Sequence, residues 1–250
     1  MSTTLFDLSG KTALITGSSQ GIGYTLAMGL MEAGARVVLN GRDADKLAAA
    51  AERLGAESLA FDVTDAAAVR TAVDGFEVAE GRIDILINNA GMQHRTPLED
   101  FEPADFDRLM RTNVHSVFHV GQAVARHMIQ RQTGKIINIA SVQTALARPG
   151  IAPYTASKGA VANLTKGMAT DWAPKGLNVN AIAPGYFDTP LNAALVADAE
   201  FTAWIAKRTP QGRWGQLPEL VGAAVFLASP AASFVNGQTL FVDGGMTACL

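Results

Sequence analysis

The chain has 250 residues, of which 48% are hydrophobic and 17% are charged, and its formal net charge is −3. This composition argues against a disordered chain, and the weak negative charge argues against nucleic acid or an anionic membrane surface as a partner. No apolar run approaches the roughly 18 residues of a membrane helix, and the sequence opens without a signal-peptide pattern. Because Cys249 is the only cysteine, we expect a cytoplasmic protein without an internal disulfide.

Short apolar segments alternate with helix-forming segments along the chain. The predicted strands are 12–16, 36–40, 58–62, 85–89, 135–141, 177–184 and 239–243. They are rich in Val, Ile and Leu, as parallel strands covered on both faces should be, and the alanine- and leucine-rich segments between them favour helix. This alternation predicts one α/β domain over residues 1–250. We expect a doubly wound Rossmann fold, with a mostly parallel seven-stranded sheet and helices on both faces.

One segment breaks this alternation. Residues 186–216 form a longer excursion after the predicted strand 177–184 and the turn that follows it. Long excursions at strand ends often cover a binding site, so we predict a substrate lid here, with a plain surface hairpin as the alternative.

The stretch TGSSQGIG at 16–23 follows the first predicted strand and opens the first predicted helix. Glycines permit a tight turn there and let the backbone approach a pyrophosphate, while the helix N-terminus presents free N–H groups to it. We therefore predict a dinucleotide phosphate loop, with these contributing residues: Gly17, Ser19, Gln20, Gly21, Ile22 and Gly23.

A tyrosine and a lysine, Tyr154 and Lys158, lie one helical turn apart, so their side chains should point the same way. An ammonium group near a phenol lowers the pKa of the phenol, which makes it a better proton acceptor near neutrality. Ser141 ends the predicted strand 135–141 and could hold a substrate oxygen. Such a tyrosine–lysine pair also occurs on ordinary helices, so by itself it leaves the function open.

The stretch TGSSQGIG, the stretch NNAG at 88–91 and the Tyr154/Lys158 pair together resemble the short-chain dehydrogenase/reductase family over nearly the whole chain. The resemblance implies that Ser141 polarises the substrate oxygen and that Tyr154 exchanges the proton. It also implies that Lys158 lowers the tyrosine pKa and bonds the nicotinamide ribose, and that Asn113 holds a water of the proton relay. Family members are usually tetramers, so a homotetramer or homodimer is expected.

The same resemblance implies further cofactor contacts. Asp62 should bond the adenine amino group, and Thr189 should bond the nicotinamide carboxamide. The remaining expected cofactor contacts are Val63, Asn89, Ala90, Gly91, Pro184 and Gly185.

The end of the second predicted strand bears on the choice of cofactor. NAD enzymes of this fold usually place an acid there, which would repel the 2′-phosphate of NADP. This chain has Asn40 and Arg42 instead, although Asp43 is near. An arginine can pair with a phosphate, so we predict that Asn40 and Arg42 favour NADP, with NAD as the alternative.

Two arginines, Arg95 and Arg148, follow strands whose ends should meet at the catalytic edge. With Gln143, Ser141 and Tyr154 they predict a polar pocket for a small anionic substrate such as a sugar acid, because arginine binds carboxylates bidentately. The alternatives are a 3-oxoacyl thioester, a neutral polyol or ketose, or a non-catalytic nucleotide-binding role. No metal is expected, since the histidines and Cys249 show no ligand spacing.

Overall fold

The computed structural model describes residues 3–249 and confirms the predicted fold class. The strands are β1 (Thr12–Ile15), β2 (Arg36–Gly41), β3 (Glu57–Ala60), β4 (Ile85–Asn88), β5 (Gly134–Ile139), β6 (Leu177–Pro184) and β7 (Thr239–Val242). They form one sheet in the order β3-β2-β1-β4-β5-β6-β7, and every pair of neighbours is parallel. The order reverses between β1 and β4, which is where a doubly wound sheet opens a crevice at its carboxyl edge.

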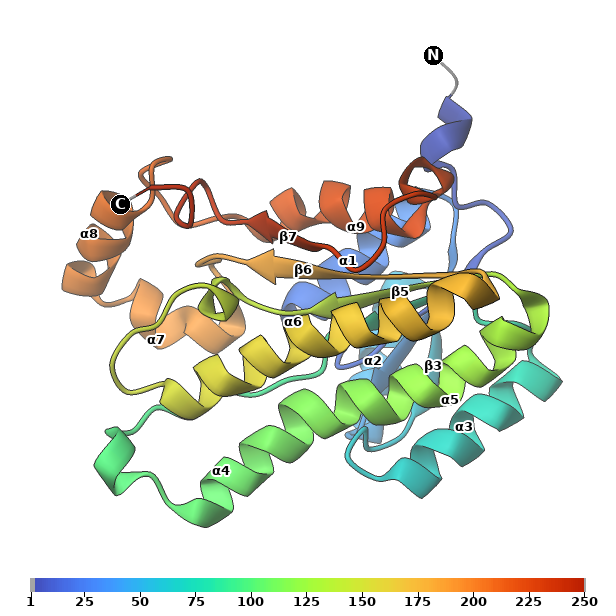
Figure 1. The fold of residues 1–250 in the computed structure, drawn as a ribbon, viewed down its shortest axis with the longest axis horizontal. Helices are drawn as coiled ribbons and strands as arrows, with labels where there is room; N and C mark the ends of the chain where they lie inside the picture. The colour runs from blue at the N-terminus through green and yellow to red at the C-terminus, as the bar shows by residue number, and fades with distance from the viewer. Residues whose placement is uncertain (1–2, 250) are drawn as a thin grey trace.

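Helices cover both faces of this sheet (Figure 1). One face carries α3 (Ala66–Ala79), α5 (Ser116–Arg131) and α6 (Ala152–Trp172), and the other carries α1 (Gly21–Glu32), α2 (Ala44–Leu54) and α9 (Val221–Ala228). The strands are buried between two hydrophobic clusters, one on each face. That double burial explains why most strands read as continuous apolar runs rather than alternating patterns.

The excursion predicted at 186–216 is largely helical. It contains a 3-10 turn (Pro190–Asn192) and the helices α7 (Ala193–Val196) and α8 (Ala199–Arg208). Ile205, Trp214 and Met246 form a small apolar cluster with Val142, so the excursion packs against the segment that follows β5. Its role as a lid stays a prediction.

The remaining helical segments are short. They are α4 (Pro103–Met110), the π-helical turn Arg111–His115 that joins it to α5, and the 3-10 turns Thr3–Phe6, Leu98–Asp100, Val142–Thr144, Ala173–Lys175, Leu217–Leu220 and Pro230–Ala232. Within residues 3–249, none of the helices combines the length and the apolar character that crossing a membrane would require.

Candidate active site

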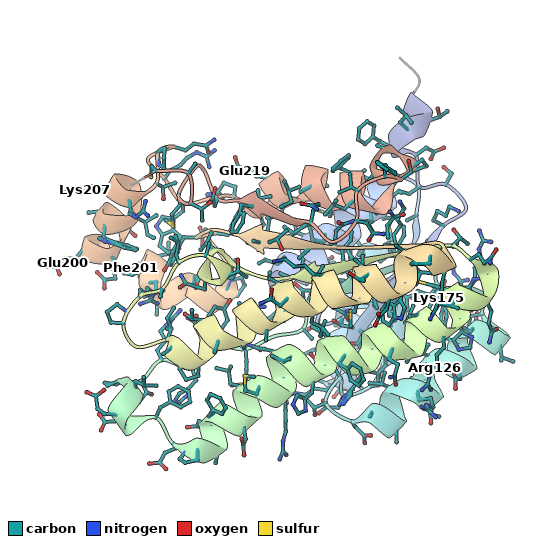
Figure 2. The ribbon with its side chains drawn as sticks, viewed as in Figure 1. Arg126, Lys175, Glu200, Phe201, Lys207 and Glu219 are labelled. Atoms are coloured by element: carbon teal, nitrogen blue, oxygen red, sulfur yellow. The ribbon has the colours of Figure 1, made fainter. Side chains whose placement is uncertain are left out.

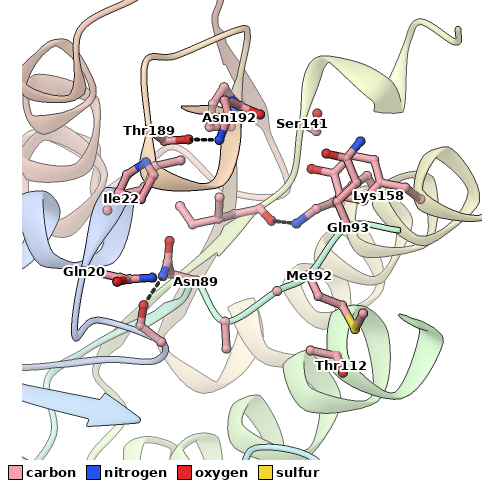
Figure 3. Close-up of a pocket in the computed structure, with 18 of the residues that line it drawn as sticks. Gln20, Ile22, Asn89, Met92, Gln93, Thr112, Ser141, Lys158, Thr189 and Asn192 are labelled. Atoms are coloured by element: carbon pink, nitrogen blue, oxygen red, sulfur yellow. Dashed lines mark hydrogen bonds between the residues drawn. The ribbon is translucent and has the colours of Figure 1, made fainter. Parts of the chain in front are cut away.

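A cleft of about 820 Å³ lies beyond the carboxyl ends of the strands, within the roughly 300–1,000 Å³ that small-molecule sites occupy. The structure brings nearly all predicted site residues to this cleft, and Figure 3 shows several of them. Those that line it are Gly17, Ser19, Gln20, Gly21, Ile22, Arg42, Asp62, Val63, Asn89, Ala90, Gly91, Arg95, Ser141, Gln143, Arg148, Tyr154, Lys158, Pro184, Gly185 and Thr189. Gly23, Asn40 and Asn113 do not line it.

The glycine loop between β1 and α1 has the backbone geometry that a phosphate cradle needs. Gly17 and Gly21 have φ angles of +59° and +61°, which L side chains rarely adopt. A Cβ on Gly17 would lie 2.8 Å from the Cα of Ala90, whereas one on Gly21 would lie 3.8 Å from its nearest neighbour and would fill the cleft side of the loop. The side chain of Gln20 does not cap α1, so the first-turn N–H groups face the cleft without a side-chain acceptor. This loop therefore fits a dinucleotide pyrophosphate.

Gly23 allows the loop to pack closely against Asn89, and it does not line the cleft itself. A Cβ there would lie 2.5 Å from the side-chain nitrogen of Asn89 and 2.7 Å from the carbonyl oxygen of Gly17. That amide of Asn89 donates to the carbonyls of Thr16 and Gly17, each at 2.9 Å, and so ties the loop to the end of β4.

Asn40 braces the same loop and does not line the cleft, and its contact with the cofactor stays a prediction. Its side chain is buried, donates to the carbonyls of Leu59 and Phe61 at 3.0 and 3.2 Å, and accepts from the N–H of Gly17 at 3.4 Å. The amide thus joins β2 to the glycine loop and to the end of β3. A neutral amide can fill this position without placing a charge in the core.

The end of the cleft that contains Arg42 also contains a cation that was not predicted from the sequence. Arg42 is exposed and lines the cleft, and Lys46, in the first turn of α2, lines it as well. Lys46 reads in the sequence as an ordinary solvated helix charge, and only its spacing of four residues from Arg42 could have signalled a shared site.

Asp62 lines the cleft and does not cap α3, because Asp65 provides that cap. Asp62 accepts hydrogen bonds from the N–H and the hydroxyl of Thr64, each at 2.8 Å. The backbone hydrogen bond from Thr64 is the main cause that lowers the pKa of Asp62, and the positive charge of Arg42 adds to it. The carboxylate is therefore ionised and available to accept a hydrogen bond in the cleft.

Ser141, Tyr154 and Lys158 meet at the centre of the cleft. The Oγ of Ser141 accepts from the N–H of Gln143 at 3.2 Å, so its own O–H can donate to a ligand. The Nζ of Lys158 donates to the carbonyl of Ile139 at 2.7 Å and lies 5.7 Å from the centre of the Tyr154 ring (Figure 3). Because Lys158 is buried, its pKa falls to about 8.

The pKa of Tyr154 departs from the sequence expectation. Burial raises it above its ordinary value, although a hydrogen bond with Ser141 and the charge of Arg95 lower it in part. Burial of the phenol outweighs these effects, so the net lowering of the pKa that was expected from Lys158 is absent. The phenol is therefore protonated near neutrality, which suits a proton donor.

Asn113 lies beneath the cleft, in the π-helical turn between α4 and α5. Its Oδ1 accepts from the N–H of Met92 at 2.8 Å, and its Nδ2 donates to the Met92 carbonyl at 2.9 Å and to the Ser157 hydroxyl at 3.1 Å. This fully buried amide fixes the segment after β4 against α6. Both N–H groups of its side chain are used in these hydrogen bonds, and the water relay that the family resemblance implies stays a prediction.

The chain after β6 completes the cofactor side of the cleft. A Cβ on Gly185 would lie 2.8 Å from the Cα of Asp243, so glycine permits the close approach of this turn to the segment after β7. The Oγ1 of Thr189 accepts from the N–H of Asn192 at 3.2 Å, which leaves the threonine O–H available to donate into the cleft.

Arg95 and Arg148 place positive charge beside Tyr154. Partial burial and the charge of Arg148 lower the pKa of Arg95. Arg95 donates to the side-chain oxygens of Gln93 and Asn192 at 2.9 and 3.4 Å. Among residues 3–249, no carboxylate forms an ion pair with either arginine. This uncompensated pair fits an anionic ligand.

Gln143 and Tyr186 also line this part of the cleft. The side chain of Gln143 is buried and accepts from the hydroxyl of Thr155 at 3.5 Å. Tyr186 was not predicted as a site residue, because in the sequence it is only one more aromatic residue at the start of the excursion.

Comparison with known proteins extends these observations. A family model described as enoyl-(acyl carrier protein) reductase matches residues 17–247. The chain is 64% identical over 251 residues to gluconate 5-dehydrogenase of Gluconobacter oxydans (strain 621H), covering 98% of both proteins. It is 50% identical over 247 residues to 5-keto-D-gluconate 5-reductase of Escherichia coli (strain K12), covering 97% of both. A solved structure of a gluconate 5-dehydrogenase from Burkholderia cenocepacia J2315, in complex with NADP and tartrate, is 60% identical, with a TM-score of 0.98 and 99% of both chains covered.

Proposed function

Because the chain belongs to the short-chain dehydrogenase/reductase family, we propose that it is an NADP(H)-dependent oxidoreductase that interconverts D-gluconate and 5-dehydro-D-gluconate. The observation that carries the proposal is the cleft that joins Tyr154 to two arginines without carboxylate partners. The names of the Gluconobacter and Escherichia relatives support this substrate, and the tartrate in the Burkholderia relative is likewise a small hydroxy acid.

The proposed chemistry divides between the cofactor and the side chains of the cleft. The nicotinamide of bound NADP(H) supplies or accepts the hydride at C5 of the sugar acid. In the reducing direction Tyr154 donates its phenolic proton to the carbonyl oxygen, and in the oxidising direction it takes the hydroxyl proton back. The raised pKa of Tyr154 keeps that proton in place until the substrate oxygen gains negative charge.

Ser141 and Lys158 support this transfer in the proposal. Ser141 donates its O–H to the substrate oxygen, because its Oγ already accepts from the N–H of Gln143. Lys158 holds a positive charge one helical turn from Tyr154 and stabilises the phenolate that forms when the proton leaves. Its pKa of about 8 leaves most of the ammonium charged near neutral pH.

The substrate carboxylate is proposed to bind Arg95 and Arg148. Both line the cleft beside the catalytic centre, and a carboxylate between them would relieve the repulsion that lowers the pKa of Arg95. A 3-oxoacyl thioester would instead need a long apolar channel, which two arginines would disfavour.

A direct assay tests the substrate. The purified protein should oxidise NADPH with 5-dehydro-D-gluconate and reduce NADP⁺ with D-gluconate, whereas acetoacetyl thioesters and sorbose should be turned over poorly. Tyr154→Phe should lose about 10²- to 10⁴-fold in kcat while it still binds NADPH, because it lacks the proton. Turnover of the thioester without turnover of the sugar acid would refute the substrate, and near-normal kcat in Tyr154→Phe would refute the mechanism.

The preference for NADP is proposed to depend on Arg42 and Lys46, which line the cleft beside Ser19. Removing one phosphate contact from a charged group costs about 1.5–3 kcal/mol. Arg42→Ala should therefore lower the ratio of kcat/KM for NADPH to kcat/KM for NADH by about 10- to 100-fold. Lys46→Ala should lower this ratio less, because the carboxylate of Asp43, 3.5 Å from the Lys46 ammonium group, competes for it. Ratios that both substitutions leave unchanged would show that these cations do not select the cofactor.

We further propose a cytoplasmic homotetramer, with a homodimer as the alternative. Phe106 on α4 and Phe118 on α5 are 41% and 46% exposed, and a Cβ on Gly159 of α6 would meet nothing within 4 Å. A partner subunit could cover these groups. Light scattering after size-exclusion chromatography measures the mass, and a monomeric mass would contradict this assembly.

A further inference from the structure

Two aromatic residues, Tyr186 and Phe201, contact Arg148 on the substrate side of the cleft. The Cζ of Arg148 lies 5.4 Å from the centre of the Phe201 ring. Tyr186 packs edge-on against the same ring, with ring centres 5.8 Å apart. In Figure 2, Phe201 lies on the side of α8 that faces the rest of the molecule, whereas its neighbour Glu200 points outward. The excursion after β6 therefore contributes an aromatic ring that packs against the guanidinium group of Arg148.

The hydrogen bonding of Arg148 is incomplete within the chain. Burial raises the pKa of Tyr186. The positive charge of Arg148, and a hydrogen bond with it, offset part of that rise. The Nε of Arg148 is buried and has no hydrogen-bond partner among residues 3–249. A guanidinium group carries five N–H donors in a planar fork, so an arginine anchored on one side by a phenol still has donors for an incoming acceptor.

The charges around Arg148 indicate which kind of hydrogen-bond acceptor it would bind. The positive charges of Arg95 and Arg148 interact unfavourably, and both Tyr154 and Tyr186 lie close enough to affect Arg95. An incoming carboxylate would offset both positive charges and accept bidentate hydrogen bonds, whereas a neutral hydroxyl would offset neither.

We propose that Tyr186 and Phe201 are positioning residues that hold the guanidinium plane of Arg148 for the substrate carboxylate, and thereby make the cleft selective for acids over neutral ketoses. This inference rests on the proposed function. The Tyr186 phenol and the Phe201 ring surround the guanidinium group of Arg148, so little side-chain freedom is lost when the acid binds. Phe201 belongs to α8, so selectivity is coupled to the placement of the predicted lid.

The test compares the acid with a neutral ketose in conservative variants. Tyr186→Phe keeps the ring but removes the hydroxyl, and should raise KM for 5-dehydro-D-gluconate about 10-fold with little change in kcat. Phe201→Leu keeps an apolar side chain but removes the ring face, and should raise it about 3- to 10-fold. Both should weaken tartrate binding to the NADP-loaded protein by similar factors in calorimetry, and neither should change kcat/KM for sorbose by more than about 2-fold.

Trp204 supplies a matched control. Its ring packs against Tyr186 and Phe201 with centres 6.0 and 5.4 Å apart, but it is 42% exposed, and among residues 3–249 the guanidinium group of Arg148 lies over the Phe201 ring and not over that of Trp204. Trp204→Phe should therefore leave KM for the acid within about 2-fold of the wild-type value.

The outcomes separate this inference from the proposed function. A wild-type protein that does not reduce 5-dehydro-D-gluconate refutes the proposed function. A wild-type protein that reduces it, with KM and tartrate affinity unchanged in both Tyr186→Phe and Phe201→Leu, refutes the positioning role alone. Equal losses on the acid and on sorbose would also refute it, because they would indicate general damage to the cleft. If one of the two variants fails to fold, the KM and tartrate affinity of the other variant decide whether the positioning role is correct.

Discussion

Replacing Lys158 with methionine should stabilise the cofactor-free protein while it abolishes turnover. Burial lowers the pKa of this lysine from 10.5 to about 8. A change of that size corresponds to about 3 kcal/mol of unfavourable burial, at about 1.4 kcal/mol per pH unit. The variant also loses the 2.7 Å hydrogen bond to the Ile139 carbonyl, worth about 1 kcal/mol. The net expectation is about 2 kcal/mol of added stability, or about 4–8 °C in Tm for a chain of this size.

The stability difference should depend on pH in a defined direction. Below pH 8 Lys158 is protonated in both the folded and the unfolded chain, so the wild-type protein carries the full unfavourable effect of burial. Between about pH 8 and pH 10.5 the unfolded chain retains a proton that the folded protein has released, so wild-type stability rises with pH. The advantage of Lys158→Met should therefore be largest near neutral pH and should shrink above pH 8.

Thermal unfolding of both proteins near pH 7 and near pH 9.5, at equal concentration and without cofactor, measures this difference. Lys166→Met is the matched control, because Lys166 lies on the same helix but is exposed. It should change stability by no more than about 0.5 kcal/mol at either pH. A lower Tm for Lys158→Met near pH 7, or a difference that stays constant between the two pH values, would refute the reasoning.

Two further substitutions test the scaffold beneath the cleft. Gly17→Ala should raise the Kd for NADPH at least about 10-fold in a fluorescence titration. The reason is that φ at Gly17 is +59° and the new methyl group would lie 2.8 Å from a backbone carbon. An unchanged Kd would contradict the proposal that this loop holds the phosphates. Asn113→Ala should destabilise the protein by about 2–4 kcal/mol in urea unfolding, because a fully buried amide is removed and the partly buried backbone groups of Met92 lose their partner. A loss below about 1 kcal/mol would contradict that bracing role.

The placement of the proposed catalytic and phosphate-loop residues could be predicted because their signals are local. The spacing of Tyr154 and Lys158 is one helical turn, and both lie on α6 as expected. The glycines of 16–23 lie between a strand and a helix, where positive φ angles are needed. Ser141 follows a strand whose apolar sequence already marked its end. In each case neighbouring residues specify the local geometry.

Asn40 and Asn113 show where sequence reasoning stopped. Each was assigned to the site by its position, yet the structure turns each amide toward backbone groups about 20 residues away in the sequence. The direction of the Tyr154 pKa shift also differs from the expectation, because helical spacing predicts the proximity of Lys158 but not the burial that raises the pKa of the phenol.

The sequence alone determined the parallel sheet, the glycine-rich turn after the first strand and the placement of Tyr154 and Lys158 on one helix, since periodicity, glycine placement and helical spacing act over a few neighbouring positions. Only the tertiary structure decided which polar groups face the cleft and what surrounds them. It brought Lys46 and Arg42 to one cleft, and it gathered Arg95, Arg148 and Tyr186 from distant segments on the same cleft, with Phe201 packed against Arg148 and Tyr186. Burial and hydrogen bonding set the pKa values there, and both depend on contacts between residues that no local pattern connects.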